Sequence, residues 1–515
     1  MTGDFNPETA STTRGKSERI LANRSATSVV LITAEFFRTL WQAFLAISAI
    51  LLVPCLWHRH VVASDLGSHL YNAWLAHLIR NGQAPGLWLA RQSTNILFDY
   101  LLSGFGAIFG FMAAEKIAVG LCVLIFFWGI FAMASAATGR APWFLLPVIA
   151  LFAYGWTFHV GFFNYYLSIG LAFLAVAILW RGTRWEWLIA IALAGLSAMA
   201  HPFGLLWLVC AIGYIALAER LPSRFQWVAA LVAAVAIVVI HYFFLNRFCY
   251  EAEPDPIYWF SGGDQLVLFG HRYWYIKWAV LIFSGFALAF DVIVRRREKG
   301  IWRAYSIPLQ LYLVIELAVF LFPRGVEFPH RVAIAMITER LTSLSAAAGC
   351  CLLAVMQPRK WHLAVSLAIA AVFFAFVYQD TGTINQIEQQ AEALVRRLPP
   401  DQRVLATLCP LDDSRVMIQH IVDLACIGHC FSYGNYEAGT EIFRVRAKPG
   451  NPYLMSSHQD AIDMEDGNYV LKASDLPAYQ MYQCTPDGTR LCIRPLVAGE
   501  KNNRLGVYEG QDSDQ

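Results

Sequence analysis

The chain has 515 residues, of which 57% are hydrophobic and only 15% are charged. In a typical soluble domain, about a quarter of the residues are charged. The composition of this chain therefore excludes a disordered chain, a coiled coil and an ordinary cytosolic enzyme. The net charge is +2, but residues 380–515 carry 12 Lys/Arg against 19 Asp/Glu, while the preceding part is basic. This pattern predicts a polytopic membrane protein with a soluble C-terminal domain.

Residues 1–38 are polar, rich in Ser and Thr, and carry several basic side chains. They lack the short apolar core and small-residue cleavage site of a secretory signal. The apolar segment at 40–57 is long enough to remain as an anchor, and its basic leading flank predicts a cytoplasmic N-terminal tail.

A polar stretch follows the first span, and then an apolar segment at 96–112 that is interrupted by Asp99 and by glycines. This segment either spans the membrane or lies in the outer interface as an amphipathic helix. If it does not span, the loops on the cytoplasmic side hold 12 basic residues and the outer connections hold four, which are Arg247, Arg272, Arg324 and Arg331. Positive charge favours the cytoplasmic side, so the interfacial alternative is preferred.

The sequence thus predicts about 11 spans, with the N-terminus inside and the C-terminal domain outside. After the first span they run at roughly 116–137, 142–158, 165–180, 186–200, 203–218, 226–245, 274–294, 305–322, 335–356 and 362–378. The membrane domain covers residues 39–379, with an outer loop at 58–114 that contains interfacial helices. We expect it in the inner (plasma) membrane.

Residues 380–515 predict an extracytoplasmic domain of α/β or α+β class. NQIEQQAEALVRRL has helical spacing, PPDQRVLATL predicts a turn and a strand, and EIFRVRA, NYVLKA, LCIRPL and RLGVYE predict short strands. Six cysteines fall on the outer side, where up to three disulfides can form: Cys249, Cys409, Cys426, Cys430, Cys484 and Cys492. The run from Cys426 through His429 to Cys430 also suggests a metal site, but it lacks a second ligand pair at the usual spacing.

Polar residues gather at the outer ends of the predicted spans, and ionisable groups beside a membrane locate function. Five separate connections converge on this face, and they predict a cavity with a carboxylate and several cations. The residues are Asp65 and His69 in the first outer loop, His159 and Asn164 in FHVGFFNYY, His201 in MAHPFG, Arg272 after a loop rich in carboxylates, and Arg331 and Arg340 beyond the next span.

The segment SDLGSHLYNAWLAHLIRNGQAPGLW, which follows a first span and opens with an acidic residue, resembles the GT-C superfamily of membrane glycosyltransferases. That superfamily includes protein O-mannosyltransferases and lipid A aminoarabinose transferases. The matching pieces are Asp65, His69, the turn with Gly82 and Pro85, and the interfacial segment that ends in AIFG. Where relatives carry a second acidic residue after the third span, this chain offers His159 and Asn164.

The resemblance implies that a sugar moves from a polyprenyl-phosphate donor to a hydroxyl group of a lipid, glycan or protein acceptor. The attacking hydroxyl must lose a proton, which calls for a carboxylate base, and Asp65 is the candidate. His69, His159, Asn164 and His201 are further catalytic candidates. Arginine binds phosphate through fork-shaped contacts, so Arg272, Arg331 and Arg340 are candidates for the donor phosphate. No metal ligands are assigned, and a divalent metal ion is left open as a cofactor.

Each assignment has a structural alternative. Asp65 can cap the helix that begins near Leu66, His201 can mark a helix break before Pro202, and Arg340 can form an ion pair with Glu339 inside the membrane. For the whole chain, the alternatives are a transporter or flippase of lipid-linked glycans, or a non-catalytic GT-C-like protein that binds a glycan or a partner. No nucleotide-phosphate loop is present, and no nucleic-acid partner is expected.

Overall fold

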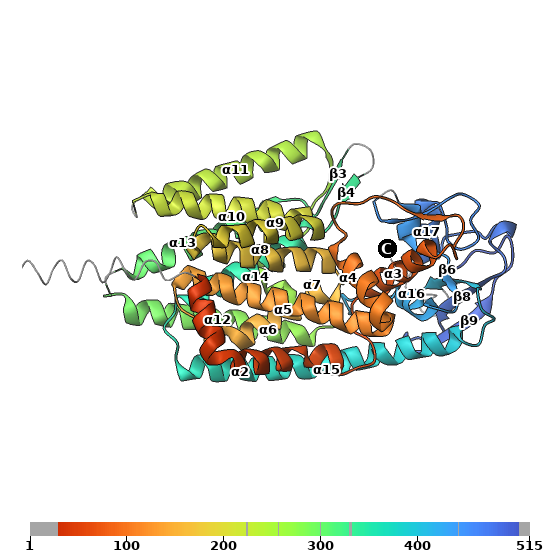
Figure 1. Cartoon of the computed structure of the whole chain (residues 1–515), viewed down its shortest axis with the longest axis horizontal. Helices are drawn as coiled ribbons and strands as arrows, with labels where there is room; N and C mark the ends of the chain where they lie inside the picture. Colours follow the sequence, from red (N-terminus) through yellow and green to blue (C-terminus); the bar gives the residue numbers. More distant parts are fainter. Residues whose placement is uncertain are drawn as a thin grey trace, which may run out of the picture.

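The computed structural model describes residues 29–222, 225–255, 257–298, 300–328, 332–411, 413–440 and 442–503. Helices that run along the long axis form one end of the molecule, and the strands of the C-terminal region lie at the other end (Figure 1). The helices are α2 (Val29–Leu56), α3 (Leu66–Arg80), α4 (Leu97–Phe109), α5 (Phe111–Thr138), α6 (Leu146–Ala153), α7 (Trp156–His159), α8 (Phe163–Arg181), α9 (Glu186–Ala200), α10 (Pro202–Arg220), α11 (Gln226–Arg247), α12 (Arg272–Arg295), α13 (Ile301–Leu321), α14 (Ile337–Ala354), α15 (Lys360–Val395), α16 (Ile421–Cys426) and α17 (His458–Glu465).

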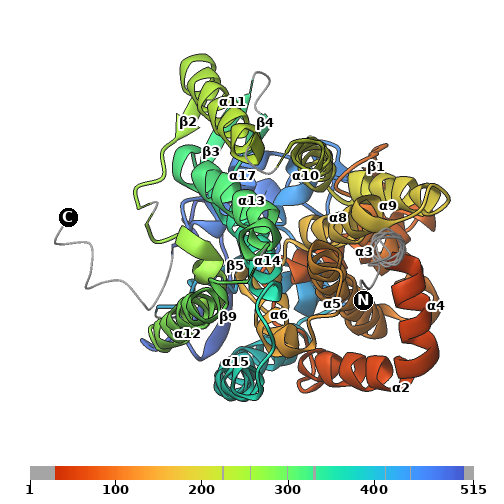
Figure 2. The same cartoon turned by 90° about the vertical axis from the view of Figure 1, so that its left-hand side faces the viewer.

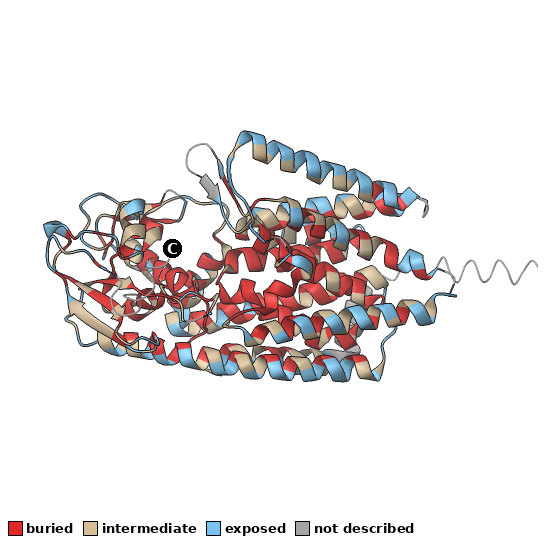
Figure 3. Ribbon diagram, turned by 180° about the vertical axis from the view of Figure 1, so that it is seen from behind, coloured by how far each residue is buried: buried red, intermediate tan, exposed pale blue. Residues whose placement is uncertain are grey.

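Within the described residues, seven helices are long and apolar enough to cross a membrane, namely α5, α8, α10, α11, α12, α13 and α15. Four shorter apolar helical segments accompany them, at Trp41–Leu56, Leu97–Phe109, Trp143–His159 and Glu186–Ala200. The outer helices expose large apolar side chains, such as Leu231 and Val239 on α11, and most of α11 is coloured as exposed in Figure 3. Such surfaces are costly in water, so the helical end is consistent with a protein embedded in a membrane.

The predicted segments and the observed helices agree in place but not always in length. Helix α4 has 13 residues and rises only about 20 Å, which is short of the roughly 30 Å of a bilayer core. The segment predicted as one span at 142–158 is divided into a short 3-10 turn at Trp143–Leu145, α6 and α7. A continuous helix over this stretch was therefore a wrong prediction, because the backbone turns at Tyr154 and Gly155 to bring His159 toward the outer loop.

Helices α5 and α8 lie inside the bundle, with α14 beside α5, as the view along the long axis shows (Figure 2). Their aromatic side chains fill the interior, and the rings of Phe126 and Tyr166 stack with centroids 4.2 Å apart. Helix α11 lies at the edge of the same view. Asn164 lies in the first turn of α8 and Arg340 in the first turn of α14.

The C-terminal region contains a four-stranded sheet in the order β6-β5-β8-β9. Strand β5 pairs in parallel with β6 and β8, and β9 pairs antiparallel with β8. The strands of the whole chain are β1 (Leu87–Leu89), β2 (Cys249–Glu251), β3 (Gly325–Phe328), β4 (Val332–Ile334), β5 (Arg403–Thr407), β6 (Phe431–Ser432), β7 (Val445–Ala447), β8 (Ala478–Gln483) and β9 (Leu491–Pro495). The mixed sheet with helices agrees with the predicted α/β or α+β class.

The strand predictions in this region have mixed outcomes. PPDQRVLATL and LCIRPL form β5 and β9, and the end of EIFRVRA forms β7. The strand predicted in NYVLKA is wrong, because only one bridge joins Val470 to Lys501, and RLGVYE lies outside the described residues. Disulfides join Cys426 to Cys430 and Cys484 to Cys492, while Cys249 and Cys409 carry free thiols.

The C-terminal region and the outer loop form one body. Helix α15 continues without a break from Lys360 to Val395, across the predicted domain boundary at 380, and it runs the length of the molecule in Figure 1. Strand β1 of the outer loop pairs antiparallel with β7. Tyr71 and Leu75 of α3 share a hydrophobic core with Val404 and Val422. We call residues 58–96 together with residues 380–503 the outer region.

Candidate functional site

Asp65 stands at the junction of the outer loop with the bundle. Its backbone N–H donates to the carbonyl oxygen of Val160 at 3.1 Å, and Ser64 N–H donates to the carbonyl of His159 at 2.8 Å. Gly161 has a φ of +88°, and a Cβ there would lie 2.6 Å from the backbone nitrogen of Asp65. Only glycine permits both this backbone angle and this approach, so the turn between α7 and α8 fixes the position of Asp65.

The side chain of Asp65 does not cap its helix. Asp65 occupies the N-cap position of α3, but its carboxylate accepts no hydrogen bond from the first turn. The carboxylate is 25% exposed, and its Oδ1 lies 3.9 Å from His420 Nε2. The capping alternative therefore does not explain why a carboxylate is present here.

His420 belongs to the outer region, and its ring is held by a carboxylate on the nitrogen that faces away from Asp65. Its Nδ1 lies 2.8 Å from Asp423 Oδ2. Helix α3 approaches so closely that a Cβ on Gly67 would lie 2.3 Å from the carbonyl oxygen of His420. A carboxylate on one ring nitrogen orients the other nitrogen, which here faces Asp65.

Three basic side chains act electrostatically on the Asp65 carboxylate, namely those of His420, His69 and Arg340. Burial opposes the charged imidazole of His420, but the hydrogen bond with Asp423 prevails and raises the pKa of His420 to about 9. Burial also raises the pKa of Asp65, against the opposing effects of His420, His69 and Arg340. At neutral pH His420 thus presents a charged imidazolium to Asp65, and the raised pKa of Asp65 favours a role in accepting protons.

His69 lies one turn further along α3 and has a carboxylate partner, Asp99. Its Nδ1 is 3.1 Å from Asp99 Oδ1, and Asp99 Oδ2 accepts a hydrogen bond from Asn164 Nδ2 at 2.8 Å. Burial lowers the pKa of His69, but Asp99 outweighs this effect and raises it to about 9. The structure thus joins His69 and Asn164, both predicted, through Asp99.

Arg340 is a half-buried cation at the start of α14. Its guanidinium carbon lies 4.9 Å from the ring centroid of Phe162 and 5.7 Å from that of Tyr165, and its Nε is buried without a hydrogen-bond partner. The alternative of an ion pair with Glu339 is wrong, because the Glu339 carboxylate lies 3.1 Å from Arg324 Nε. Within the described residues, no carboxylate is within ion-pair distance of Arg340.

Three of the other predicted residues form hydrogen bonds that stabilise the fold. His201 is the N-cap of α10, where its Nδ1 accepts from Phe203 N–H at 3.2 Å. The ring of His159 turns toward Val62, with its Nδ1 2.9 Å from that carbonyl oxygen. Arg272 donates to Asp380 on α15 at 2.5 Å and is not among the charges that act on Asp65. Arg331 lies outside the described residues.

Residues of the outer region lie beside these groups, and no pattern in the sequence indicated them. Ser68 Oγ on α3 donates to Glu437 Oε1 at 3.1 Å, and Asn435 Nδ2 donates to both Ser68 and Asp423. Burial raises the pKa of Glu437 to about 7. Asp99 had a signal in the sequence, a carboxylate inside an apolar segment, whereas Asp423 and Glu437 had none.

No group of three or more His, Cys, Asp or Glu side chains in the described part of the chain is arranged to hold a metal ion. No residues can therefore be named as ligands for the divalent ion that the resemblance leaves open. Comparisons with protein families, with curated proteins and with solved structures found no match to this chain.

A largely apolar groove lies in the helical bundle. It has a volume of about 580 Å³ and lies between α6, α12, α13 and α14, where Phe152, Leu281 and Leu353 line it. Ala346 of α14 also lines the groove, six residues after Arg340, which corresponds to a rise of about 9 Å along the helix. Arg340 and one residue of the groove wall thus belong to the same helix, about 9 Å apart along its axis.

Proposed function

We propose that this chain is a GT-C-type membrane glycosyltransferase, in which Asp65 is the base that activates a hydroxyl acceptor. The observation that carries the proposal is the Asp65 carboxylate itself. It caps no helix, is partly exposed, and is surrounded by His420, His69 and Arg340. A partly buried carboxylate with a raised pKa, beside cations and without a capping role, is typical of functional sites.

The proposed reaction transfers a sugar from polyprenyl phosphate to a hydroxyl group. The acceptor oxygen forms a bond to the anomeric carbon, and the bond from that carbon to the phosphate oxygen breaks. The acceptor proton goes to Asp65, and the electron pair of the broken bond goes to the phosphate. Charge grows on the leaving phosphate, so cations held beside it lower the barrier.

Three cationic groups are available for that phosphate. Arg340 has an Nε with no hydrogen-bond partner, and a guanidinium suits the phosphate fork. His420 and His69, whose pKa values are raised to about 9 by Asp423 and Asp99 against the effect of burial, are charged at neutral pH. The groove beside α14 suits the polyprenyl tail, because most of the side chains that line it are apolar.

The proposal is tested by Asp65→Asn in membranes that contain the full chain. The assay offers a panel of polyprenyl-phosphate sugars and measures released polyprenyl phosphate. Asn cannot accept the proton, so we expect a loss of roughly 10²-fold or more. The variant should fold like the wild type, since the Asp65 side chain makes no capping bond. Donor binding should therefore persist. Asp487→Asn, at an exposed position of the outer region, is the matched control and should keep wild-type release.

Arg340→Gln separates binding from proton transfer, because it should weaken retention of labelled donor while Asp65 remains. Equal release by wild type and Asp65→Asn would disprove the role of Asp65. If the wild type retained a donor but released no phosphate from any member of the panel, a flippase or a glycan-binding protein would replace the enzyme as the best proposal.

A further inference from the structure

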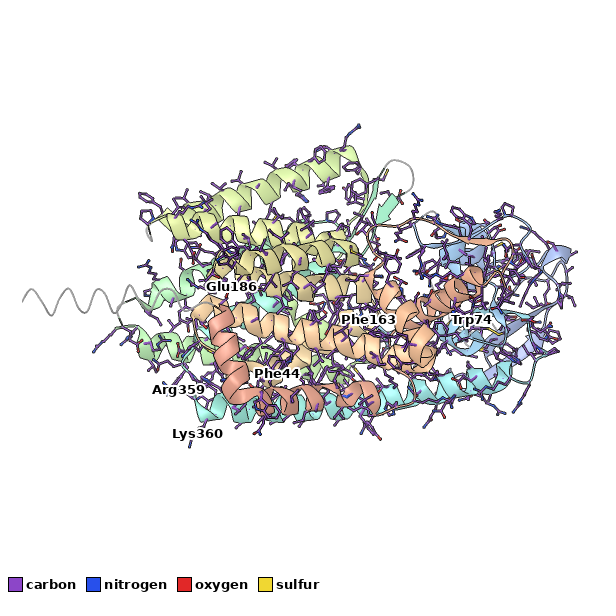
Figure 4. The ribbon with its side chains drawn as sticks, in the orientation of Figure 1. Phe44, Trp74, Phe163, Glu186, Arg359 and Lys360 are labelled. Atoms are coloured by element: carbon purple, nitrogen blue, oxygen red, sulfur yellow. A yellow bond between two sulfur atoms is a disulfide. The ribbon has the colours of Figure 1, made fainter. Side chains whose placement is uncertain are left out.

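A second cavity lies at the end of the bundle opposite the outer region, and the proposed transferase does not use it. It has a volume of about 630 Å³, within the roughly 300–1,000 Å³ of ligand pockets. Its wall is formed by the ends of α5, α8, α10, α11, α12 and α13, and its lining includes Arg140, Arg181, Glu219, Arg295, Arg303 and Ile307. Figure 4 places Arg359 and Lys360, which follow α14 closely, at the end far from Trp74 of α3. We call this the helix-end cavity.

The helix-end cavity has an excess of positive charge. Four arginines line it, against the single carboxylate of Glu219. Arg295 is neutralised by Asp291 and Glu298, at 3.0 and 2.9 Å, and Arg181 lies 3.6 Å from Glu219. Arg140 and Arg303 form no ion pair with any residue that the structure describes.

The donors of these arginines are only partly used. Arg140 turns one terminal nitrogen toward the carbonyl oxygens that end α14, including Ala354 at 3.1 Å and Val355 at 3.0 Å. Arg181 uses its Nε on the carbonyl of Ala136 at 3.0 Å. Burial, and then the positive charge of Arg295, lower the pKa of Arg140. An anion in the cavity would relieve this repulsion and fill the remaining N–H donors.

The surroundings of the cavity indicate which anion. Exposed tryptophans lie close to cavity residues along the chain: Trp302 precedes Arg303, Trp227 follows Gln226, and Trp185 lies four residues after Arg181. Trp185, Trp227 and Trp302 have exposed fractions of 83%, 50% and 63%. Exposed tryptophans mark the level of the lipid headgroups. Basic pockets between helix ends at that level are typical sites for anionic headgroups. Ile307 and Val355 supply an apolar part of the wall, where the start of an acyl chain can pack.

We propose that the helix-end cavity binds the phosphate of an anionic phospholipid, with Arg140, Arg181 and Arg303 as its partners. The lipid would bridge the ends of α5, α8 and α13, which no disulfide or strand connects in the described chain. Its site is separate from Asp65, so the proposal does not depend on the transferase assignment.

The test uses the full chain in nanodiscs of phosphatidylcholine to which phosphatidylglycerol is added, with the bound lipid counted by native mass spectrometry. We expect selective retention of phosphatidylglycerol, and about fivefold weaker binding in Arg303→Gln, since one basic residue contributes about 1 kcal/mol near a lipid surface. Arg296→Gln is the matched control, because Arg296 is exposed at the same end and does not line the cavity. Arg303 makes no bond to a described residue, so its variant should fold like the wild type.

Arg181→Gln provides a second variant, with the same expected weakening. Equal retention of phosphatidylglycerol and phosphatidylcholine by the wild type would overturn the proposal, and so would equal binding by the Arg303, Arg181 and Arg296 variants. A further arm adds soluble glycerol phosphate at the same concentration. If this soluble anion displaced phosphatidylglycerol completely, the cavity would be a site for a soluble phosphate and the lipid assignment would be wrong.

Discussion

Replacing Asp423 with Asn tests whether this carboxylate sets the charge of His420. In the wild type, burial opposes the charged imidazole, but the hydrogen bond with Asp423 raises the pKa of His420 from 6.5 to about 9. Asn has nearly the same size and still offers an oxygen to Nδ1, but it carries no charge. The two largest effects that favour the charged imidazole are then lost, and only Glu465 and Asp65 still oppose burial, so the pKa of His420 should fall toward its ordinary value.

The size of the effect follows from the pKa difference. Because the folded-state pKa of His420 lies above its unfolded value of 6.5, its contribution to stability is fully present below pH 6.5 and is lost as the pH rises through about 9. One pKa unit corresponds to about 1.4 kcal/mol, so the loss is on the order of 3 kcal/mol. His420 is only 3% exposed, so solvent screening reduces this little. In the outer region, a loss of this size lowers the midpoint temperature of unfolding by roughly 10 °C.

The assay is thermal unfolding of the purified chain in detergent between pH 6 and pH 10. Neighbouring carboxylates also raise the pKa values of His60 and His69 to about 9, against the effect of burial, and this background is common to all variants. The difference between wild type and Asp423→Asn therefore isolates His420. If the variant lost as much stability as the wild type between pH 6.5 and 10, the argument that Asp423 keeps His420 charged would be refuted.

Two further outcomes are expected. Gly161→Ala should cost about 1–3 kcal/mol and reduce any transfer activity, because its Cβ would collide with the backbone of Asp65. Gly213→Ala is the control, because a Cβ there meets nothing within 4 Å. It lies inside α10, so it should raise stability by roughly 0.5–1 kcal/mol and leave activity unchanged. A periplasmic reporter fused after residue 298 should be inactive and one fused after residue 380 should be active, since the loop before α13 is rich in arginine; the reverse pattern would invert the predicted topology.

The apolar segments could be located from the sequence because each helix carries its own signal. Hydrophobic runs of membrane length predict helices wherever they occur, and helices occur in all the predicted places. Their lengths were less certain, as the broken segment from Trp143 to His159 shows. A turn inside an apolar run depends on what packs against it. Here the backbone N–H groups of Ser64 and Asp65 donate hydrogen bonds to the carbonyl oxygens of His159 and Val160.

Part of the candidate site could also be predicted. Asp65, His69 and Asn164 stand out as polar groups at the ends of apolar segments, and the structure brings His69 and Asn164 together through Asp99. Arg340 also stood out, and it acts on Asp65 as a nearby charge. Arg272, which looked the same in the sequence, is bound by Asp380, because an arginine alone does not show which carboxylate the fold will place beside it.

The sequence by itself determined that this chain is apolar and helical, that its polar end is a small region with strands, and that Asp65 is an unusual carboxylate. Only the tertiary structure decided that His420 and Asp423, about 355 residues further along the chain, complete the surroundings of Asp65. The physical reason is that local patterns specify a helix or a strand, whereas the pKa of a buried group depends on charges brought to it across space. The close approach of Gly67 to His420 makes that contact, and no periodicity along the chain records it.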